Sequence, residues 1–326
     1  MPPKIRGMTA NLTSHTSSLR RFTLMVSGED AIDAGLERDI PPSGLPQERF
    51  LLGDRLPIAP VLLMGQSELA VNPNEVIACL QPVHLHATRD HLILMAQSQI
   101  DLTASESANL LQVALPFIEE DFRNKVLFQG QRDWFISAGP FTSLATHSID
   151  QAHGRNIDWW MPRDTSEFGV AKLWRKLQNE IQMLWHIDLV NQERDQRGYP
   201  SINSLWISGI GKLADIQTPS LLKNVNQIYG DHPLLAGLAK YLAIPHQGEI
   251  DFSRLQNAFA WIDHPESIWD KLRRALLSNE LDEIEVIDFP KGQTRHRIFT
   301  AKDLNKKSWA FWKKSELLTW QEIISS

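Results

Sequence analysis

Two short runs of the sequence concentrate side chains that make directional hydrogen bonds. They are residues 155–160 (RNIDWW) and residues 191–194 (NQER). Guanidinium, amide and carboxylate groups at this density can bind a carboxylate or a phosphate, and they can equally form closed networks that hold loops together. Both interpretations are open at this point. The candidate ligand-binding residues in these runs are Arg155, Asn156, Asp158, Asn191, Glu193 and Arg194.

A third candidate is the run 209–212 (GIGK), which follows a predicted strand over residues 202–208. Glycines let backbone N–H groups approach an anion, and the lysine adds positive charge. The spacing is not that of a nucleotide-binding P-loop, because Trp206 stands where its first glycine belongs and Leu213 follows the lysine. We expect either an anion-approach loop or a turn with glycine at positive φ. The candidates here are Asn203, Trp206, Gly209, Gly211 and Lys212.

Three histidines and an aspartate, His84, His86, Asp90 and His91, form a candidate divalent-metal site. Imidazoles at positions i and i+2 of a strand share a face and can bind one ion. His91 joins the other two only if the turn at 87–90 folds back. The alternative is that these histidines are structural or exposed.

The clearest element that could position these groups is a helix that begins near residue 170. Its apolar residues recur at helical spacing, with Asn179 on the opposite side. Glu180 lies at the edge of the apolar face, so it is a candidate for a perturbed pKa or a buried pair with an arginine. The apolar positions are Val170, Leu173, Trp174, Leu177, Ile181 and Leu184.

The remaining pattern mixes strands and helices. Short apolar pieces at 22–26, 50–52 and 60–64 indicate strands and loops, with a helix near 30–38. Hairpins are predicted at 83–95, 125–137 and 284–300, and helices from 105, over 234–242 and over 254–277, the last interrupted at Pro265. The sequence therefore predicts an α/β or α+β fold, a mixed sheet flanked by helices.

Domain organisation follows from the same pattern. Residues 1–21 are predicted to be a disordered leader in which Met8 is an alternative start. Residues 22–326 are predicted to form one α/β domain, with a smaller subdomain within 82–200 as an option.

Composition narrows the function classes. The chain has 326 residues, of which 42% are hydrophobic, and a formal net charge of −6. This negative net charge argues against a surface that binds nucleic acid or an anionic membrane over its whole extent. The most apolar stretch is far shorter than the roughly 20 residues that span a bilayer. One cysteine, Cys79, excludes an internal disulfide and favours the reducing cytoplasm. A basic, aromatic tail at 306–314 leaves a nucleic-acid-associated regulator as a minor alternative.

Four longer strings of the sequence resemble one uncharacterised bacterial family. They are residues 153–162 (HGRNIDWWMP), 177–184 (LQNEIQML), 190–194 (VNQER) and 202–211 (INSLWISGIG). Members of that family are labelled RpfE-type regulatory proteins or phosphoglycerate-mutase-like proteins. Looser similarity at 82–86 and 229–234 extends the resemblance over roughly residues 50–315.

The run 190–211 is also similar to a segment of the archaeal-type cofactor-independent phosphoglycerate mutases, metal-dependent members of the alkaline phosphatase superfamily. This resemblance implies a degenerate α/β fold of that superfamily. Those enzymes need an N-terminal Asp ligand, a Ser nucleophile and a later Asp/His cluster to hold two divalent ions. The carboxyl-terminal region offers only Asp263, His264 and Asp288, so no counterpart is recognised in the sequence.

The sequence thus predicts a noncatalytic or regulatory phosphoglycerate-mutase-like protein. The expected ligand is small and anionic, no cofactor is identified, and a homo-oligomer is an option. One alternative is a metal-dependent phosphoryl-transfer enzyme that draws its divalent-metal ligands from the histidine cluster. The other is the nucleic-acid-associated regulator.

Overall fold

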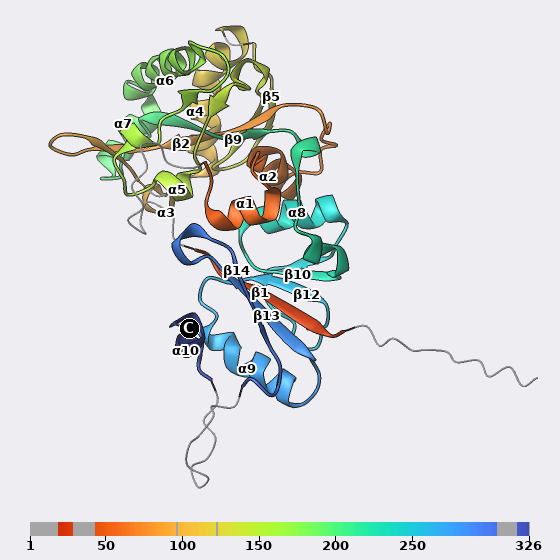
Figure 1. The fold of residues 1–326 in the computed structure, drawn as a ribbon. Helices are drawn as coiled ribbons and strands as arrows, with labels where there is room; N and C mark the ends of the chain where they lie inside the picture. The colour runs from red at the N-terminus through yellow and green to blue at the C-terminus, as the bar shows by residue number, and fades with distance from the viewer. Residues whose placement is uncertain (1–18, 29–42, 96, 122, 305–317, 326) are drawn as a thin grey trace, which may run out of the picture.

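The computed structural model describes residues 19–28, 43–95, 97–121, 123–304 and 318–325 (Figure 1). Most of the predicted leader, the helix predicted near 30–38 and the basic tail at 306–314 lie outside the described residues. Residue 21, the last of the predicted leader, begins the first strand. None of the described helices combines the length and apolar character needed to cross a membrane.

The larger of two main sheets has six strands, of which five are parallel and β14 is antiparallel. The predicted hairpin at 284–300 is confirmed as β13 and β14. Across the sheet the strands are β11 (His246–Gln247), β10 (Gln227–Tyr229), β12 (Ala258–Trp261), β1 (Arg21–Met25), β13 (Glu283–Asp288) and β14 (Arg295–Phe299).

Helices cover both faces of this sheet. Side chains alternate along β1, so Phe22 and Leu24 pack towards α9 (Glu266–Leu277) and α10 (Trp320–Ser325). Met25 packs instead towards α1 (Pro46–Leu52), α2 (Ile58–Gln66) and α8 (Pro233–Leu242). We call this sheet with its helices the large-sheet lobe.

Two predictions for this lobe are wrong. The predicted helix over 254–277 is a strand, β12, followed by the shorter helix α9, because the fully buried run 258–261 fits the middle of a parallel sheet. The apolar pieces at 50–52 and 60–64, expected in strands and loops, belong to helices α1 and α2. Pro60 lies in the first turn of α2, where no intrahelical N–H bond is lost.

The second sheet has four antiparallel strands, and the hairpin predicted at 125–137 forms part of it. One face packs on α2 through Cys79 and Phe135. The other packs on α4 (Ala104–Pro116) and α6 (Val170–His186), which confirms the predicted helices there. In order the strands are β5 (Val126–Gln129), β6 (Trp134–Ser137), β2 (Ile77–Val83) and β9 (Ser204–Gly211). We call residues 77–211, which run from the start of β2 to the end of β9 and carry this sheet and its helices, the small-sheet lobe.

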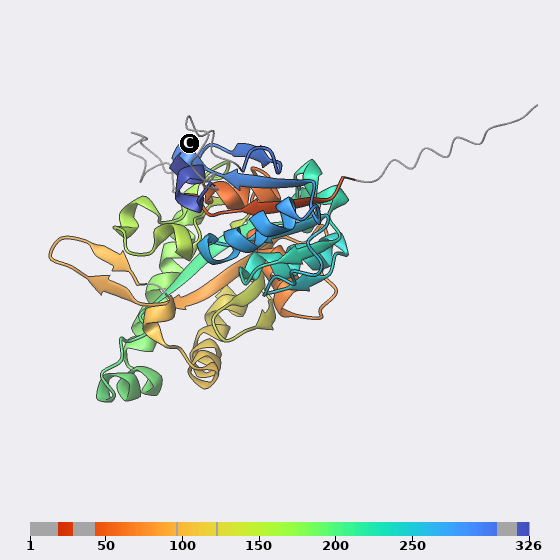
Figure 2. The ribbon, with the colours of Figure 1, turned by 90° about the horizontal axis from the view of Figure 1, so that it is seen from below.

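Helix α2 therefore lies between the two sheets, and the lobes share it as a common layer (Figures 1 and 2). Close approach at two glycines makes this packing tight. A Cβ on Gly237 of α8 would overlap the carbonyl oxygen of Val61, and a Cβ on Gly209 would lie 2.7 Å from the backbone nitrogen of Ala59. The stretch 82–200, in which the sequence suggested a smaller subdomain, lies inside the small-sheet lobe.

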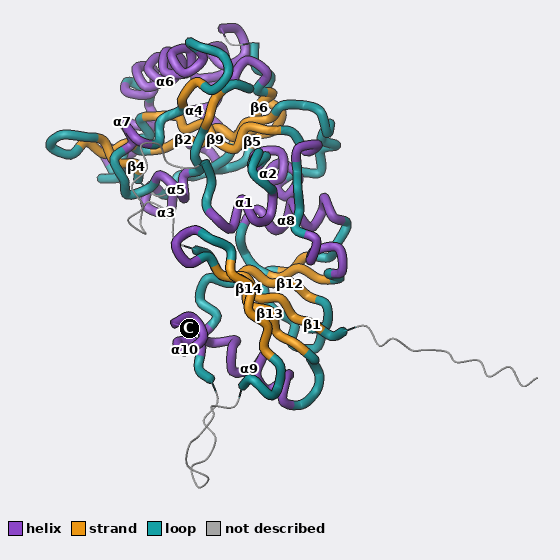
Figure 3. Tube along the Cα trace, viewed as in Figure 1, coloured by secondary structure: helices purple, strands orange, loops and turns teal. Residues whose placement is uncertain are grey.

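Shorter elements complete the structure, and the hairpin predicted at 83–95 is confirmed as β3 and β4 (Figure 3). These elements are β3 (Leu85–Ala87), β4 (Leu92–Leu94), α3 (Gln97–Ile100), a π-helical turn (Phe117–Asp121), β7 (Leu144–Ala145), α5 (Ile149–Ala152), β8 (Arg163–Asp164), α7 (Leu189–Gln196) and the 3₁₀ turns Gly139–Phe141, Ile157–Trp159, Leu213–Asp215, Ser220–Asn224 and Pro290–Gly292.

Candidate functional site

Three parallel strands of the large sheet end at a cavity between the lobes. Beyond their carboxyl ends lie Ser27 after β1, His232 after β10 and Asp263 after β12. The small-sheet lobe adds Asp150 and Arg155 to the lining, and the cavity measures about 650 Å³. We call it the interlobe cavity. Its position matters because open α/β sheets bind ligands outside the carboxyl ends of their strands.

Hydrogen bonds connect the residues on the large-sheet side. Ser27 Oγ donates to Asp263 Oδ1 at 2.5 Å, and Trp261 Nε1–H lies 2.9 Å from Ser27 Oγ and 3.2 Å from Asp263 Oδ1. The His232 ring stacks on Trp261 with 3.7 Å between the ring centroids. These contacts fix Ser27, Trp261, His232 and Asp263 relative to one another.

His232 is a neutral hydrogen-bond donor at this site. Its Nδ1 accepts from the backbone N–H of Leu234 at 3.3 Å, which assigns the ring proton to Nε2. Burial lowers the pKa of His232 to about 4, although the charge of Asp263 opposes the shift. The ring is therefore uncharged at pH 7.

Two carboxyl groups nearby are harder to ionise than usual. Burial raises the pKa of Asp150. Burial also raises the pKa of Glu48 on α1 to about 7, helped by the charge of Asp150 and opposed by the hydrogen bond from the Leu45 N–H. Glu48 lines an adjoining cavity of about 490 Å³, which shares Asp150, His153 and His232 with the interlobe cavity.

The lobes are also tied together beside this site. The buried side chain of Gln151 on α5 accepts from the Gly44 N–H at 3.0 Å and donates to the Gly44 carbonyl at 3.3 Å. This pair fixes the start of α1 against the small-sheet lobe, and so it positions Gln47 and Glu48 on their cavities.

Of the residues predicted from sequence, Asn191, Arg194 and Asn203 hold the backbone of the small-sheet lobe. Asn191 bonds the Trp185 carbonyl at 2.7 Å and both the N–H and carbonyl of Ile202. Asn203 makes a reciprocal pair with the backbone of Leu85, at 2.7 Å and 3.0 Å.

Arg194 is fully buried and satisfied. Its guanidinium reaches Glu106 Oε2 at 3.0 Å, the Pro200 carbonyl at 2.8 Å and the Ile100 carbonyl. Arg197 binds the other oxygen of Glu106 at 2.7 Å. The sequence singled out residues dense in hydrogen bonds, and these three act within the protein's own network.

The glycine run differs from its predicted form. Strand β9 continues through Gly211, so residues 209–211 do not form the separate loop or turn expected after residue 208. The expected positive φ is confirmed at Gly209, whose φ is 65°, where the pairing of β9 with β2 shifts register. A Cβ on Gly211 would lie 2.7 Å from Pro57 Cα, and the two glycines therefore let the start of α2 approach the strand. Lys212 follows the strand, and buried Trp206 donates to the His147 carbonyl at 2.8 Å.

The other predicted residues are more exposed. Asn156 caps a 3₁₀ turn by accepting from the Asp158 N–H at 3.0 Å. Glu180 contacts Lys176 at 3.6 Å within α6, where the sequence suggested an arginine partner. Exposed positions are those of Asp158, Asn179 and Glu193. Arg155 is the predicted candidate that reaches the interlobe cavity, and its guanidinium also lies 4.9 Å from the Trp160 ring centroid.

The histidine cluster does not gather into a metal site. His84 Nδ1 lies 2.7 Å from the Ser201 carbonyl, the rings of His84 and His86 are 6.0 Å apart, and His91 pairs with Asp90 at 2.8 Å. Throughout the described residues, no group of three or more His, Cys, Asp or Glu side chains is placed to hold a metal ion. The histidine cluster therefore does not fit the two-ion site that the enzyme alternative requires.

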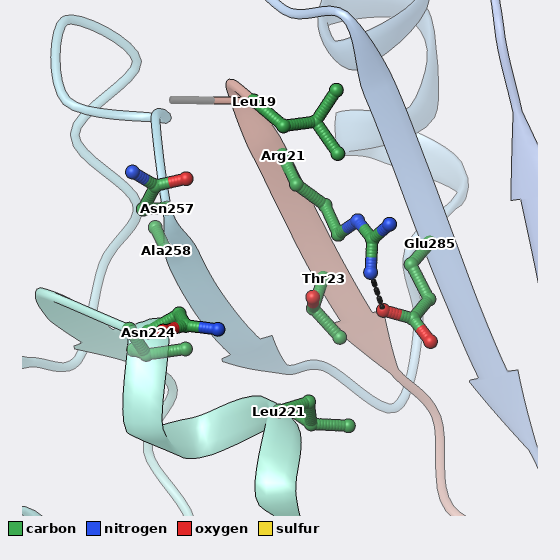
Figure 4. A pocket seen from close by; sticks show the side chains of 9 residues that line it. Leu19, Arg21, Thr23, Leu221, Asn224, Asn257, Ala258 and Glu285 are labelled. Atoms are coloured by element: carbon green, nitrogen blue, oxygen red, sulfur yellow. Dashed lines mark hydrogen bonds and ion pairs between the residues drawn. The ribbon is translucent and has the colours of Figure 1, made fainter. Parts of the chain in front are cut away.

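A further cavity of about 420 Å³ lies at the opposite, amino-terminal end of β1 (Figure 4). Arg21 crosses it to Glu285 at 3.2 Å and also bonds Glu283 at 2.7 Å. Glu285 in turn contacts His296 at 2.8 Å. The charges in this cavity are thus paired with one another.

These features define an α/β protein with a candidate site between two sheet-bearing lobes. No protein-family model matches the sequence, and no curated protein matches it. A cofactor-independent phosphoglycerate mutase from Thermoplasma acidophilum is similar in structure, with a TM-score of 0.36 and 12% identity over 86% of this chain and 90% of that chain. The PH0037 protein from Pyrococcus horikoshii is similar with a TM-score of 0.43 and 12% identity, over 88% and 90% of the two chains.

Sequence reasoning missed most of the cavity lining. Ser27, His232 and Asp263 lie far apart in the chain, and none was a candidate ligand-binding residue. Asp263 was considered only as a counterpart of the metal ligands, and His232 only as part of the resembling stretch 229–234. What the three residues share in the sequence is that each follows a short strand within a few residues. Recognising those strands as parallel neighbours would have brought the three residues to one sheet edge.

Proposed function

We propose that this chain is an RpfE-type, phosphoglycerate-mutase-like protein that binds a small anionic ligand in the interlobe cavity and acts in a regulatory, noncatalytic role. The observation that carries the proposal is the cavity itself. It lies at the carboxyl edge of β1, β10 and β12, and it is lined by the permanent positive charge of Arg155.

The lining matches a ligand that carries both an anionic group and hydroxyl groups. Arg155 supplies the cation, and the Nε2–H of His232 supplies a neutral donor, whereas Ser27, whose hydroxyl proton goes to Asp263, can only accept. Asp150 and Asp263 supply acceptors for hydroxyl groups. A phosphorylated or carboxylated hydroxy compound fits this combination better than a purely apolar molecule does.

Isothermal titration with 3-phosphoglycerate and with inorganic phosphate tests the binding. Arg155→Gln should weaken binding about 10- to 100-fold, the value of one charge-assisted hydrogen-bonding group. Arg89→Gln is the matched control, because Arg89 is exposed in the β3–β4 turn and does not line the cavity. Equal affinity of the two variants, or no heat with either probe, would contradict the proposal.

The noncatalytic role has its own test. Purified protein is incubated with 3-phosphoglycerate and with p-nitrophenyl phosphate, with Mn²⁺ or Zn²⁺ added, and product is measured. Metal-dependent turnover that is abolished by Asp263→Asn would favour the phosphoryl-transfer enzyme instead. Absence of turnover together with Arg155-dependent binding supports the regulatory role.

A further inference from the structure

Helix α6 carries an exposed seam of mixed apolar and charged residues on its outer side. The seam consists of Leu173, Lys176, Glu180 and Met183 of α6, followed by Ile187, the C-cap residue directly after the helix. Glu180 is half-buried, with its Oε2 covered, and the other four side chains are exposed. Met183 and Ile187 are more than 70% exposed and Leu173 is 40% exposed, which is unusual for large apolar side chains along one helix and its cap. In Figure 1, α6 lies on the outer side of the small-sheet lobe, away from the large-sheet lobe.

The spacing of the seam is that of a coiled coil. Leu173, Glu180 and Ile187 are seven residues apart, and Lys176 and Met183 form a second row with the same interval. These rows correspond to the a and d positions of a heptad. The helix therefore has two separate stripes, because its other face is buried in the core through Trp174, Leu177, Ile181 and Trp185.

The order of the seam residues is complementary to itself when two copies run antiparallel. In antiparallel pairing, an a residue faces a d residue of the other helix. Leu173 then faces the partner's Met183, and Glu180 faces the partner's Lys176, with both contacts repeated by two-fold symmetry. In the same register Ile187 lies opposite the N-cap Gly169 of the other copy. Lys176 and Glu180 are 3.6 Å apart within each α6, so the two copies together form a cluster of four alternating charges. Parallel pairing would instead place Glu180 against Glu180 and Lys176 against Lys176, so charge selects the antiparallel arrangement.

We propose that α6 forms an antiparallel, two-fold homodimer contact through this seam. The occupant of the exposed face is a second copy of this chain. The helix is about 25 Å long, so the contact is small and association is expected in the micromolar range. The proposal is independent of the ligand proposed above.

Sedimentation equilibrium of the full chain from about 5 to 200 µM measures the association. Lys176→Glu and Glu180→Lys should each raise the dimer dissociation constant about tenfold, because two attractive pairs become two like-charge pairs. The double variant Lys176→Glu/Glu180→Lys should restore the wild-type constant. Arg175→Glu is the control, since it carries the same charge change about 100° further round the helix.

Cross-linking tests the register separately. Leu173→Cys/Met183→Cys should give a disulfide-linked dimer, whereas Leu173→Cys alone should not, since the two copies of that position would lie about 15 Å apart along the axis. The native Cys79 is buried and does not interfere. A monomer at every concentration, a dimer unaffected by the single charge reversals, or equal cross-linking by Leu173→Cys alone would overturn the proposal.

Discussion

Replacing Glu48 with glutamine should stabilise the protein at pH 8 and have little effect at pH 5. Glu48 is 2% exposed, and its pKa in the folded protein is about 7 against an ordinary value of 4.5. Between these values the folded state holds a proton that the unfolded chain has released. The contribution of Glu48 to the unfolding free energy is therefore present in full below pH 4.5 and is lost as pH rises to 7.

The size of the effect follows from that difference. Two and a half pH units correspond to about 3 kcal/mol of unfolding free energy. Glutamine resembles the protonated carboxyl, and its amide oxygen can still accept from the Leu45 N–H, now 2.6 Å from Glu48 Oε2. The variant should consequently exceed the wild type by about 3 kcal/mol at pH 8, while the two agree within about 1 kcal/mol at pH 5.

Urea unfolding at pH 5, 6, 7 and 8 measures this difference. His232 also titrates, but its pKa is lowered, so its contribution rises with pH and is common to both proteins. Glu68→Gln is the control, because the Glu68 side chain is 95% exposed and should change stability by less than about 0.5 kcal/mol. A Glu48→Gln effect of the same size at every pH would refute the argument.

Two further predictions concern packing. Arg194→Ala should lower the unfolding free energy by about 3–5 kcal/mol in urea, because it removes the buried cation paired with Glu106 and leaves the carbonyls of Ile100 and Pro200 without that donor. Arg197→Ala removes only a half-exposed partner of the same acid and should cost under about 1 kcal/mol, so equal losses would contradict this prediction. Gly237→Ala should cost at least about 2 kcal/mol by forcing α8 away from Val61. Gly139→Ala, with open space at its Cβ, should be nearly neutral in the same urea unfolding experiment. A neutral Gly237→Ala would contradict the prediction, because it would show that the layers can separate.

Local signals explain what the sequence predicted about the fold. In the hairpins at 125–137 and 284–300, the two strands follow one another in the chain and are joined by short connections, so their pairing is local. The helix over α6 has a long apolar stripe whose period is visible within one window. Strand β12 was missed because four apolar residues before Pro265 carry no periodicity that separates a buried strand from a helix.

The site was harder to predict because its residues meet through tertiary structure. Ser27 and Asp263 are 236 positions apart in the chain, yet they share a hydrogen bond. Arg155 was a candidate because it lies in a dense polar run, and the same criterion selected Asn191, whose bonds all go to backbone groups of its own lobe. Density of polar residues therefore identifies hydrogen-bond networks without showing whether their partner is the protein or a ligand.

The sequence strings on which the resemblance rests contain several residues that bond or pack within the protein itself. Between residues 177 and 211, the side chains of Gln178, Asn191 and Arg194 bond partners within the small-sheet lobe. Gly209 and Gly211 leave room for the start of α2 against strand β9. Such residues specify how that lobe is assembled. The proposed ligand chemistry depends instead on the interlobe cavity, which Arg155 lines together with Ser27 and Asp263 at the sheet edge of the large-sheet lobe. Under the proposed function, substitutions at that edge or at Arg155, rather than within residues 177–211, are therefore the ones that should change binding while leaving the unfolding free energy nearly intact.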